Sequence, residues 1–94
     1  MARTIELLVK IDSYKIFFAK VREIDAPNYS LIIFDPIDLS TMKLKAKRNE
    51  YGSYGDFLGD MTLLKSNSEK YNGVSHEVTK LAEKLLSTAE MEIN

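Results

Sequence analysis

The chain has 94 residues, of which 45% are hydrophobic and 29% are charged, and its formal net charge is −1. This length suits a single hydrophobic core, so we expect residues 1–94 to form one domain. The near-neutral charge argues against a basic surface that binds nucleic acid. No apolar run approaches the roughly 20 residues that cross a membrane, and Glu6, Lys10 and Asp12 interrupt the N-terminal segment. We therefore expect an intracellular protein with no membrane partner and no direct nucleic-acid partner.

The first predicted element is a helix over residues 3–18. Thr4 is a candidate N-cap, and apolar side chains recur at helical spacing for about four turns. They include Leu8, Ile11, Ile16 and Phe17. This stripe gives the predicted helix one face to bury in a core.

A long connection, residues 19–35, follows this helix and is rich in apolar side chains. Its segment LIIF, residues 31–34, also fits a buried strand. A single strand would have no partner, because no other segment alternates convincingly between apolar and polar residues. Long apolar loops in small helical domains are more often functional than flexible. We therefore expect this connection to form one wall of a binding site.

A short helix is predicted next, because Asp38 or Ser40 can cap a segment whose apolar residues share one face. Those residues are Leu39, Met42 and Ala46. We expect this helix to be shorter than the others.

A longer helix is predicted to begin near Ser53, because the residues from Ser53 to Asp56 resemble a capping box. We expect it to end at Asn72 and Gly73, since both residues tolerate the left-handed backbone conformation that commonly closes a helix. The same two residues raise a second possibility, namely that the Asn72 side chain also binds a ligand.

The last predicted helix begins after Ser75, a candidate N-cap, and carries apolar residues at helical spacing. They are Val78, Leu81, Ala82, Leu85, Ala89 and Ile93. The last two connections between predicted helices are short, which is typical of antiparallel neighbours in a bundle. The pattern as a whole predicts an all-α bundle.

The residue types that support catalysis are scarce. The absence of cysteine excludes disulfides, a thiolate nucleophile and a cysteine-type zinc site. His76 has no nucleophile motif beside it, and we expect it to be exposed in the first turn of the last helix. Asp56 and Asp60 are four residues apart and suit either chelation or solvent exposure, of which we favour solvent exposure. We therefore expect no enzyme activity, no cofactor and no metal.

Five segments in order carry a resemblance to a known family. They are IFFAKV (16–21), APNYSLII (26–33), DPIDLSTMKLK (35–45), EYGSYGDFLGDMTLL (50–64) and NSEKYNG (67–73). In sequence and spacing the chain resembles a bromodomain over nearly its whole length. The resemblance implies a left-handed four-helix bundle with a long loop between the first and second helices. It also implies non-catalytic binding of acetyl-lysine.

The resemblance assigns a binding role to nine residues. By position, Asn72 corresponds to the asparagine whose side-chain amide donates to the acetyl carbonyl, and Tyr29 to the tyrosine that reaches the carbonyl through a water. Val78 takes the gatekeeper position at the mouth of the pocket. The remaining positions correspond to the apolar shelf, the loop side of the pocket and the inner face of the third helix: Phe17, Val21, Ile24, Ala26, Ser68 and Tyr71.

Physical chemistry is consistent with this assignment, because acetylation converts a charged amine into a neutral amide that an apolar pocket with one donor can accept. Core packing remains an alternative for the apolar and aromatic positions. The chain also departs from the family pattern, with Lys15-Ile16-Phe17 in place of the common Trp-Pro-Phe. This change makes the shelf less aromatic and leaves Asn72 and Tyr29 untouched.

The resemblance also implies a partner and a location. We expect the partner to be an acetylated histone tail or another acetylated protein, and the domain to belong to a larger chromatin-associated protein in the nucleus. The competing hypothesis is a degenerate bundle that serves as a protein-interaction scaffold without affinity for acyl-lysine. The presence of Asn72 and Tyr29 favours the acetyl-lysine reader.

Overall fold

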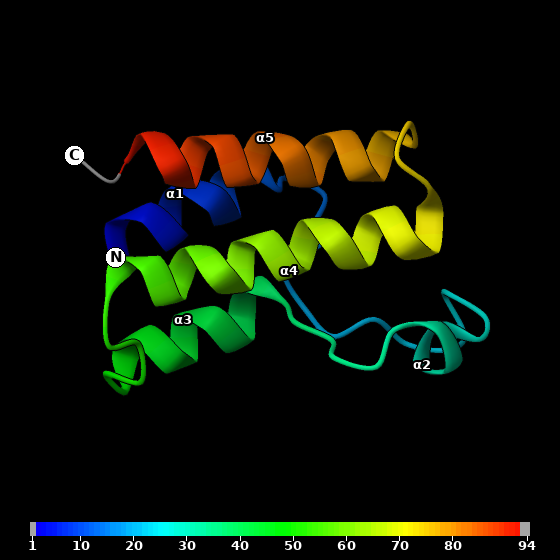
Figure 1. The fold of residues 1–94 in the computed structure, drawn as a ribbon, viewed down its shortest axis with the longest axis horizontal. Helices are drawn as coiled ribbons and strands as arrows, with labels where there is room; N and C mark the ends of the chain where they lie inside the picture. Colours follow the sequence, from blue (N-terminus) through cyan, green and yellow to red (C-terminus); the bar gives the residue numbers. More distant parts are fainter. Residues whose placement is uncertain (1, 93–94) are drawn as a thin grey trace.

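The computed structural model describes residues 2–92, which contain five helices and no strand. The helices are α1 (Ala2–Ile11), α2 (Tyr29–Ile32), α3 (Leu39–Lys47), α4 (Tyr54–Asn72) and α5 (Glu77–Met91). Helices α4 and α5 run antiparallel along each other, and α1 packs against α3 and α5 (Figure 1). The prediction of an all-α bundle is confirmed. Within the described residues, no helix is long and apolar enough to cross a membrane.

The hydrophobic core lies between α1, α3, α4 and α5. Its fully or almost fully buried side chains are Ile5, Leu8, Leu39, Met42, Phe57, Met61, Leu64, Leu85 and Ala89. The Phe57 ring packs against two tyrosine rings in edge-to-face arrangements, with centroid distances of 5.7 Å to Tyr51 and 5.3 Å to Tyr54. Burial of a side chain as large as Phe57 contributes about 1.5–3 kcal/mol to folding. The core therefore fixes how the four longer helices pack.

The first helix is shorter than predicted, because α1 ends at Ile11 and not at residue 18. The Asp12 carboxylate accepts the backbone N–H groups of Ile16 and Phe17 at 2.9 and 2.8 Å, which draws the chain into a turn. The carboxylate competes with helical bonding, as aspartate side chains often do. Thr4 lies inside α1 and is buried, so its predicted role as an N-cap is wrong.

The long connection contains one short helix, α2, which the sequence analysis did not anticipate. The alternative of a strand at residues 31–34 is wrong, because its first two residues belong to α2 and no strand occurs among the described residues. Two side chains of α4 hold this connection in place. The Tyr71 hydroxyl donates to the carbonyl of Pro27 at 2.8 Å, and the Asn67 amide donates to the carbonyl of Asp35 at 2.9 Å.

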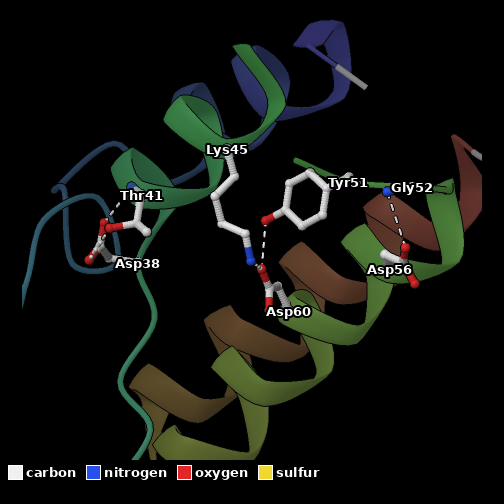
Figure 2. A network of polar contacts seen from close by, with 7 residues as sticks. All are labelled: Asp38, Thr41, Lys45, Tyr51, Gly52, Asp56 and Asp60. Atoms are coloured by element: carbon white, nitrogen blue, oxygen red, sulfur yellow. Dashed lines mark hydrogen bonds and ion pairs between the residues drawn. The ribbon is translucent and has the colours of Figure 1, made fainter. Parts of the chain in front are cut away.

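Asp38 is the N-cap of α3, as predicted, and its carboxylate accepts the backbone N–H of Thr41 at 2.7 Å. The next loop is fixed by a second carboxylate, shown in Figure 2. Asp60 accepts bonds from Lys45 at 2.8 Å and from the Tyr51 hydroxyl at 2.6 Å. The preference for a solvent-exposed Asp60 is therefore wrong, since this carboxylate joins α3, the loop and α4. Burial, followed by the hydrogen bond to Asp60, raises the pKa of Tyr51.

The ends of α4 follow the sequence signals. Ser53 caps the helix by accepting the N–H of Asp56 at 3.2 Å. The Asp56 carboxylate accepts the N–H of Gly52 at 3.1 Å, so the capping box is displaced by one residue from the usual pairing (Figure 2). At the other end, Gly73 follows Asn72 with φ 100° and ψ 154°. These angles lie in a region that is essentially restricted to glycine, which explains why the helix stops there.

The N-cap of α5 is His76 and not Ser75 as predicted. The Nδ1 atom of His76 accepts the backbone N–H of Val78 at 3.1 Å, while the residue stays exposed. The helix extends to Met91. Ile93, which was predicted to continue its apolar face, lies outside the described residues.

Candidate functional site

An open cavity of about 490 Å³ lies at the end of the bundle where α4 ends and α5 begins. One wall comes from the last turns of α4 and the first turn of α5, and the other comes from the segment between α1 and α2, including residues 15–17 and the start of the long connection, together with Tyr29 at the start of α2. Helix α2 lies at this same end of the bundle (Figure 1). The long connection is therefore a wall of the cavity, as the sequence predicted.

Eight of the nine predicted site residues line this cavity. They are Phe17, Val21, Ala26, Tyr29, Ser68, Tyr71, Asn72 and Val78. Ile24 is the exception, because this residue is 79% exposed and does not line the cavity. The placement of Ile24 in the pocket is therefore wrong, since the loop turns this residue toward solvent.

The shelf of the cavity is positioned by backbone contacts around Phe17. Asp12 accepts the N–H of Phe17, and the Phe17 carbonyl accepts the N–H of Leu39 at 2.8 Å. The Phe18 carbonyl likewise accepts the N–H of Ser40 at 2.9 Å. Both sides of the Phe17 backbone are thus fixed to the bundle, which orders the shelf before any ligand arrives.

Two tyrosines connect the loop wall to α4. The rings of Tyr29 and Tyr71 are tilted by 59° with their centroids 5.0 Å apart, a favourable aromatic geometry. The Tyr71 hydroxyl is already bonded to the carbonyl of Pro27. Burial, with a smaller effect from Tyr71, raises the pKa of Tyr29. Tyr29 therefore keeps its hydroxyl proton at neutral pH and can donate to a ligand or a bridging water.

A chain of polar groups runs behind Asn72 into the bundle. The Asn72 Nδ2 atom donates to Ser68 Oγ at 3.3 Å, and Ser68 Oγ lies 2.9 Å from Thr79 Oγ1. The Thr79 hydroxyl in turn donates to the Gly73 carbonyl at 2.7 Å. These bonds join the end of α4 to the first turns of α5, so Asn72 is held from behind while its side chain lines the cavity.

The charged residues that line the cavity are mostly cations. They are Lys15, Lys20, Arg22 and Asp25. Arg22 pairs with Asp25 at 3.1 Å, and both side chains remain largely exposed. The ammonium of Lys15 lies 5.7 Å from the centre of the Phe18 ring, a distance that allows a weak cation–π interaction. The cavity therefore has apolar walls and a rim with excess positive charge.

Sequence reasoning missed three polar residues that support the site, namely Asp12, Asn67 and Thr79. Each is buried, with exposed fractions of 1%, 9% and 0%. Thr79 occupies the same buried face of α5 as Ala82 and Leu85. For Thr79 the sequence did contain a signal, because a polar residue stands there at an inward position of an apolar stripe. Buried polar groups need hydrogen-bond partners, so such a position indicates a polar contact inside the bundle.

The arrangement suits binding better than catalysis. Among the described residues, no group of three or more His, Cys, Asp or Glu side chains is placed to hold a metal ion. The cavity brings together two side-chain amides, two phenols and several apolar side chains. The Asn67 amide and the Tyr71 hydroxyl already donate to backbone carbonyls, which leaves Asn72 and Tyr29 as the polar groups for a ligand. Such a site can accept a neutral ligand with one hydrogen-bond acceptor and a small apolar group.

Comparison with known proteins identifies the family. The family model described as Bromodomain matches residues 1–84 of the chain. The chain belongs to the bromodomain family. Bromodomains are acetyl-lysine reader modules that are generally non-catalytic. The resemblance recognised in the sequence is therefore confirmed.

Curated relatives with this domain are much longer proteins. The chain is 39% identical over 84 residues to bromodomain-containing protein 9 of Danio rerio, covering 89% of this chain and 13% of that protein. It is 45% identical over 73 residues to bromodomain-containing protein 9 of Xenopus tropicalis, covering 77% and 12%. It is also 41% identical over 76 residues to tyrosine-protein kinase BAZ1B of Danio rerio, covering 78% and 5%. The chain thus spans a small part of each relative's length.

Solved bromodomain structures share the fold. The bromodomain of human BAZ1A superposes with a TM-score of 0.85 at 27% identity, covering 97% of this chain and 88% of that one. The second bromodomain of Candida albicans Bdf1, bound to an imidazopyridine, gives a TM-score of 0.84 at 29% identity, covering 97% and 91%. Bromodomains are left-handed four-helix bundles, and this similarity confirms the predicted architecture.

Proposed function

We propose that residues 1–94 act as one reader domain that binds acetyl-lysine in the cavity. In this proposal the Asn72 side-chain amide donates to the acetyl carbonyl, and Tyr29 contacts the same carbonyl through a water. The observation that carries the proposal is the cavity itself, which combines these two polar groups with apolar walls from Phe17, Val21 and Ala26.

The chemistry of the walls favours the acetylated over the unmodified side chain. An ammonium group that enters an apolar cavity loses its hydration, and this site offers it no acidic partner apart from Asp25, which is paired with Arg22. The other rim cations also repel it. A neutral acetamide has neither penalty, and its carbonyl gains a donor from Asn72. Its methyl group fills a space that water would otherwise occupy.

The partner and the cellular setting are part of the same proposal. The family resemblance supports an acetylated histone tail, or another acetylated protein, as the ligand. It also supports a nuclear, chromatin-associated role as one module of a larger protein. No enzymatic step is assigned to this domain, because its polar groups suit ligand recognition alone.

Calorimetric titration of the domain with acetylated and unmodified histone peptides is the direct test. We expect binding to acetylated peptides only. Asn72→Ala removes the donor to the acetyl carbonyl and should weaken binding about tenfold to hundredfold, equivalent to about 1–3 kcal/mol. Asn72→Asp keeps the side-chain shape and replaces the donor with an acceptor, so it should weaken binding at least as much.

Ser66→Ala is the matched control, because Ser66 is exposed on the same helix and does not line the cavity. Circular dichroism should show that all three variants keep the helical fold. If no peptide binds above its unmodified counterpart, the scaffold alternative takes the place of the reader. If a folded Asn72→Ala variant binds as tightly as the parent, Asn72 is not the donor.

A further inference from the structure

The polar chain behind Asn72 has a direction that follows from its hydrogen-bond partners. A hydroxyl group carries one proton, so it donates once and accepts otherwise. The Thr79 hydroxyl donates its proton to the Gly73 carbonyl at 2.7 Å. In its 2.9 Å contact with Ser68, Thr79 must therefore accept, and Ser68 must donate.

The same reasoning fixes the orientation of the Asn72 amide. Because Ser68 has used its proton on Thr79, its oxygen offers only an acceptor to its remaining neighbour, Asn72. An amide oxygen facing that acceptor would be repelled, whereas the amide nitrogen can donate to it, as it does at 3.3 Å. The amide nitrogen carries two hydrogens. One of them is used inside the bundle, and the second remains for a ligand in the cavity.

These hydrogen bonds are buried, which strengthens their hold on the Asn72 amide. Ser68 is 4% exposed and Thr79 is fully buried, so water does not compete effectively with their mutual bond. Gly73 contributes the final acceptor, and its glycine-specific backbone angles place its carbonyl where Thr79 can reach it. This series of hydrogen bonds therefore runs from the Gly73 carbonyl, directly after α4, to the Asn72 side chain, which lines the cavity.

We propose that Thr79 and Ser68 are positioning residues that hold the Asn72 amide with its nitrogen in the donating orientation. This proposal rests on the proposed binding of acetyl-lysine through Asn72. Neither hydroxyl need touch the ligand. Without the Thr79 hydroxyl, Ser68 regains the freedom to donate to the amide oxygen of Asn72, and the amide can adopt the reversed orientation. Only part of the population then presents the donor, which lowers the apparent affinity in proportion.

The first test measures affinity for an acetylated peptide that the parent binds. Thr79→Val replaces the hydroxyl with a methyl group of similar size and should weaken binding about threefold to tenfold. Thr79→Ser restores the hydroxyl and should recover most of the affinity. Ser68→Ala interrupts the chain one step later and should weaken binding to a similar extent. The matched controls are Thr88→Val on α5 and Ser66→Ala on α4, which should bind as the parent does.

The second test separates positioning from simple loss of packing. In an Asn72→Ala background there is no amide to orient, so adding Thr79→Val should produce no further loss of affinity. Such a double-mutant cycle isolates the coupling between the two sites. An equal loss from Thr79→Val in both backgrounds would overturn the proposal.

The third test needs no ligand and so distinguishes this proposal from the function on which it rests. The Asn72 side-chain amide signals can be assigned in a ¹H–¹⁵N spectrum by their loss in Asn72→Asp. Thr79→Val should shift these signals and speed their hydrogen exchange severalfold, whereas Thr88→Val should leave them unchanged. Identical Asn72 signals in both variants would overturn the positioning role. Failure of the parent to bind any acetylated peptide would instead overturn the proposed function.

If Thr79→Val fails to fold, Ser68→Ala and Thr79→Ser decide the question. Loss of affinity in Ser68→Ala together with parent-like binding in Thr79→Ser supports the proposal. Parent-like affinity and parent-like Asn72 signals in Ser68→Ala overturn it, because the chain would then have no effect on the amide. A loss in Thr79→Ser as large as the loss in Ser68→Ala also overturns it, because the hydroxyl would then not be the relevant group.

Discussion

Replacement of Asp12 by alanine should destabilise the fold and loosen the cavity shelf together. Asp12 is only 1% exposed, and its carboxylate accepts two backbone N–H groups, from Ile16 at 2.9 Å and from Phe17 at 2.8 Å. Both residues line the cavity. The turn also includes a bond from the Lys15 N–H to the Asp12 carbonyl, with Lys15 at a positive φ of 54°. Removal of the carboxylate leaves this turn without its central acceptor.

The expected loss of stability follows from the two backbone N–H groups that Asp12→Ala leaves without an acceptor. Each buried donor left without a partner costs about 1–3 kcal/mol, and bonds to a charged acceptor lie toward the upper part of that range. Water can reach the N–H of Ile16 in part, because that residue is 41% exposed. A total of about 2–4 kcal/mol is therefore reasonable, which is a large share of the roughly 5–15 kcal/mol that stabilises a typical domain.

Urea unfolding followed by circular dichroism measures this loss. Asp12→Asn keeps one acceptor oxygen and should lose roughly half as much free energy as Asp12→Ala. Asp35→Ala is the matched control, since Asp35 is an exposed aspartate between α2 and α3 whose backbone carbonyl, which the substitution keeps, accepts the bond from Asn67. A free energy of unfolding within about 0.5 kcal/mol of the parent, the range of ordinary surface substitutions, would refute the reasoning for Asp12.

The effect should also depend on pH. Burial raises the pKa of Asp12 above its ordinary value of 3.8, and the N–H donors of Phe17, Ile16 and Phe18 offset part of that rise. The native state therefore holds this proton more tightly than the unfolded chain does. The resulting stabilisation is complete below the unfolded pKa and disappears as the pH rises through the native pKa. The stability difference between parent and Asp12→Ala should accordingly widen as the pH falls from neutral toward 3.8.

Two further predictions concern the mouth of the cavity. Val78→Tyr places a large ring at a residue that lines the cavity. It should narrow the entrance and reduce affinity for longer acyl-lysines more than for acetyl-lysine. Identical binding profiles of parent and variant across an acyl series would contradict this. The lining cations Lys15, Lys20 and Arg22 should repel a multiply basic acetylated peptide, so its affinity should improve as salt rises and the screening length falls from about 30 Å at 0.01 M to about 10 Å at 0.1 M. The control is the same peptide with neutral flanking residues, which should show a weaker salt dependence. A steep loss of affinity with added salt would mean that acidic groups dominate the rim.

Much of the fold was predictable because its signals are local. The caps at Asp38 and Ser53 and the stop at Gly73 depend on nearby residues alone, and the structure contains all three. The end of α1 was missed because the apolar spacing continues past Ile11 to Phe17, while the competing carboxylate of Asp12 leaves no periodic trace. The periodicity of apolar residues shows which face of a helix can be buried. It does not show where a side chain accepts a backbone N–H group and so ends the helix.

The site was predictable where a motif fixed a position and unpredictable where a loop decided the direction of a side chain. Tyr29 and Asn72 line the cavity as the motif implied, whereas Ile24 of the same loop faces solvent. No rule of spacing applies across residues 19–35, because their path is fixed by distant contacts. Two such contacts are the bonds from Tyr71 to Pro27 and from Asn67 to Asp35.

The stop at the end of α4 links stability to recognition. Gly73 adopts angles that other residues avoid, which ends the helix directly after Asn72 and turns the Gly73 carbonyl toward Thr79. Thr79 then sets the direction of the Ser68 bond, and Ser68 sets the face that the Asn72 amide presents. A helix terminus usually leaves carbonyl groups without partners. Here the carbonyl of the C-cap residue Gly73 accepts the bond from Thr79. In the proposed reader, the residue that ends the helix therefore also influences which group of Asn72 faces the ligand.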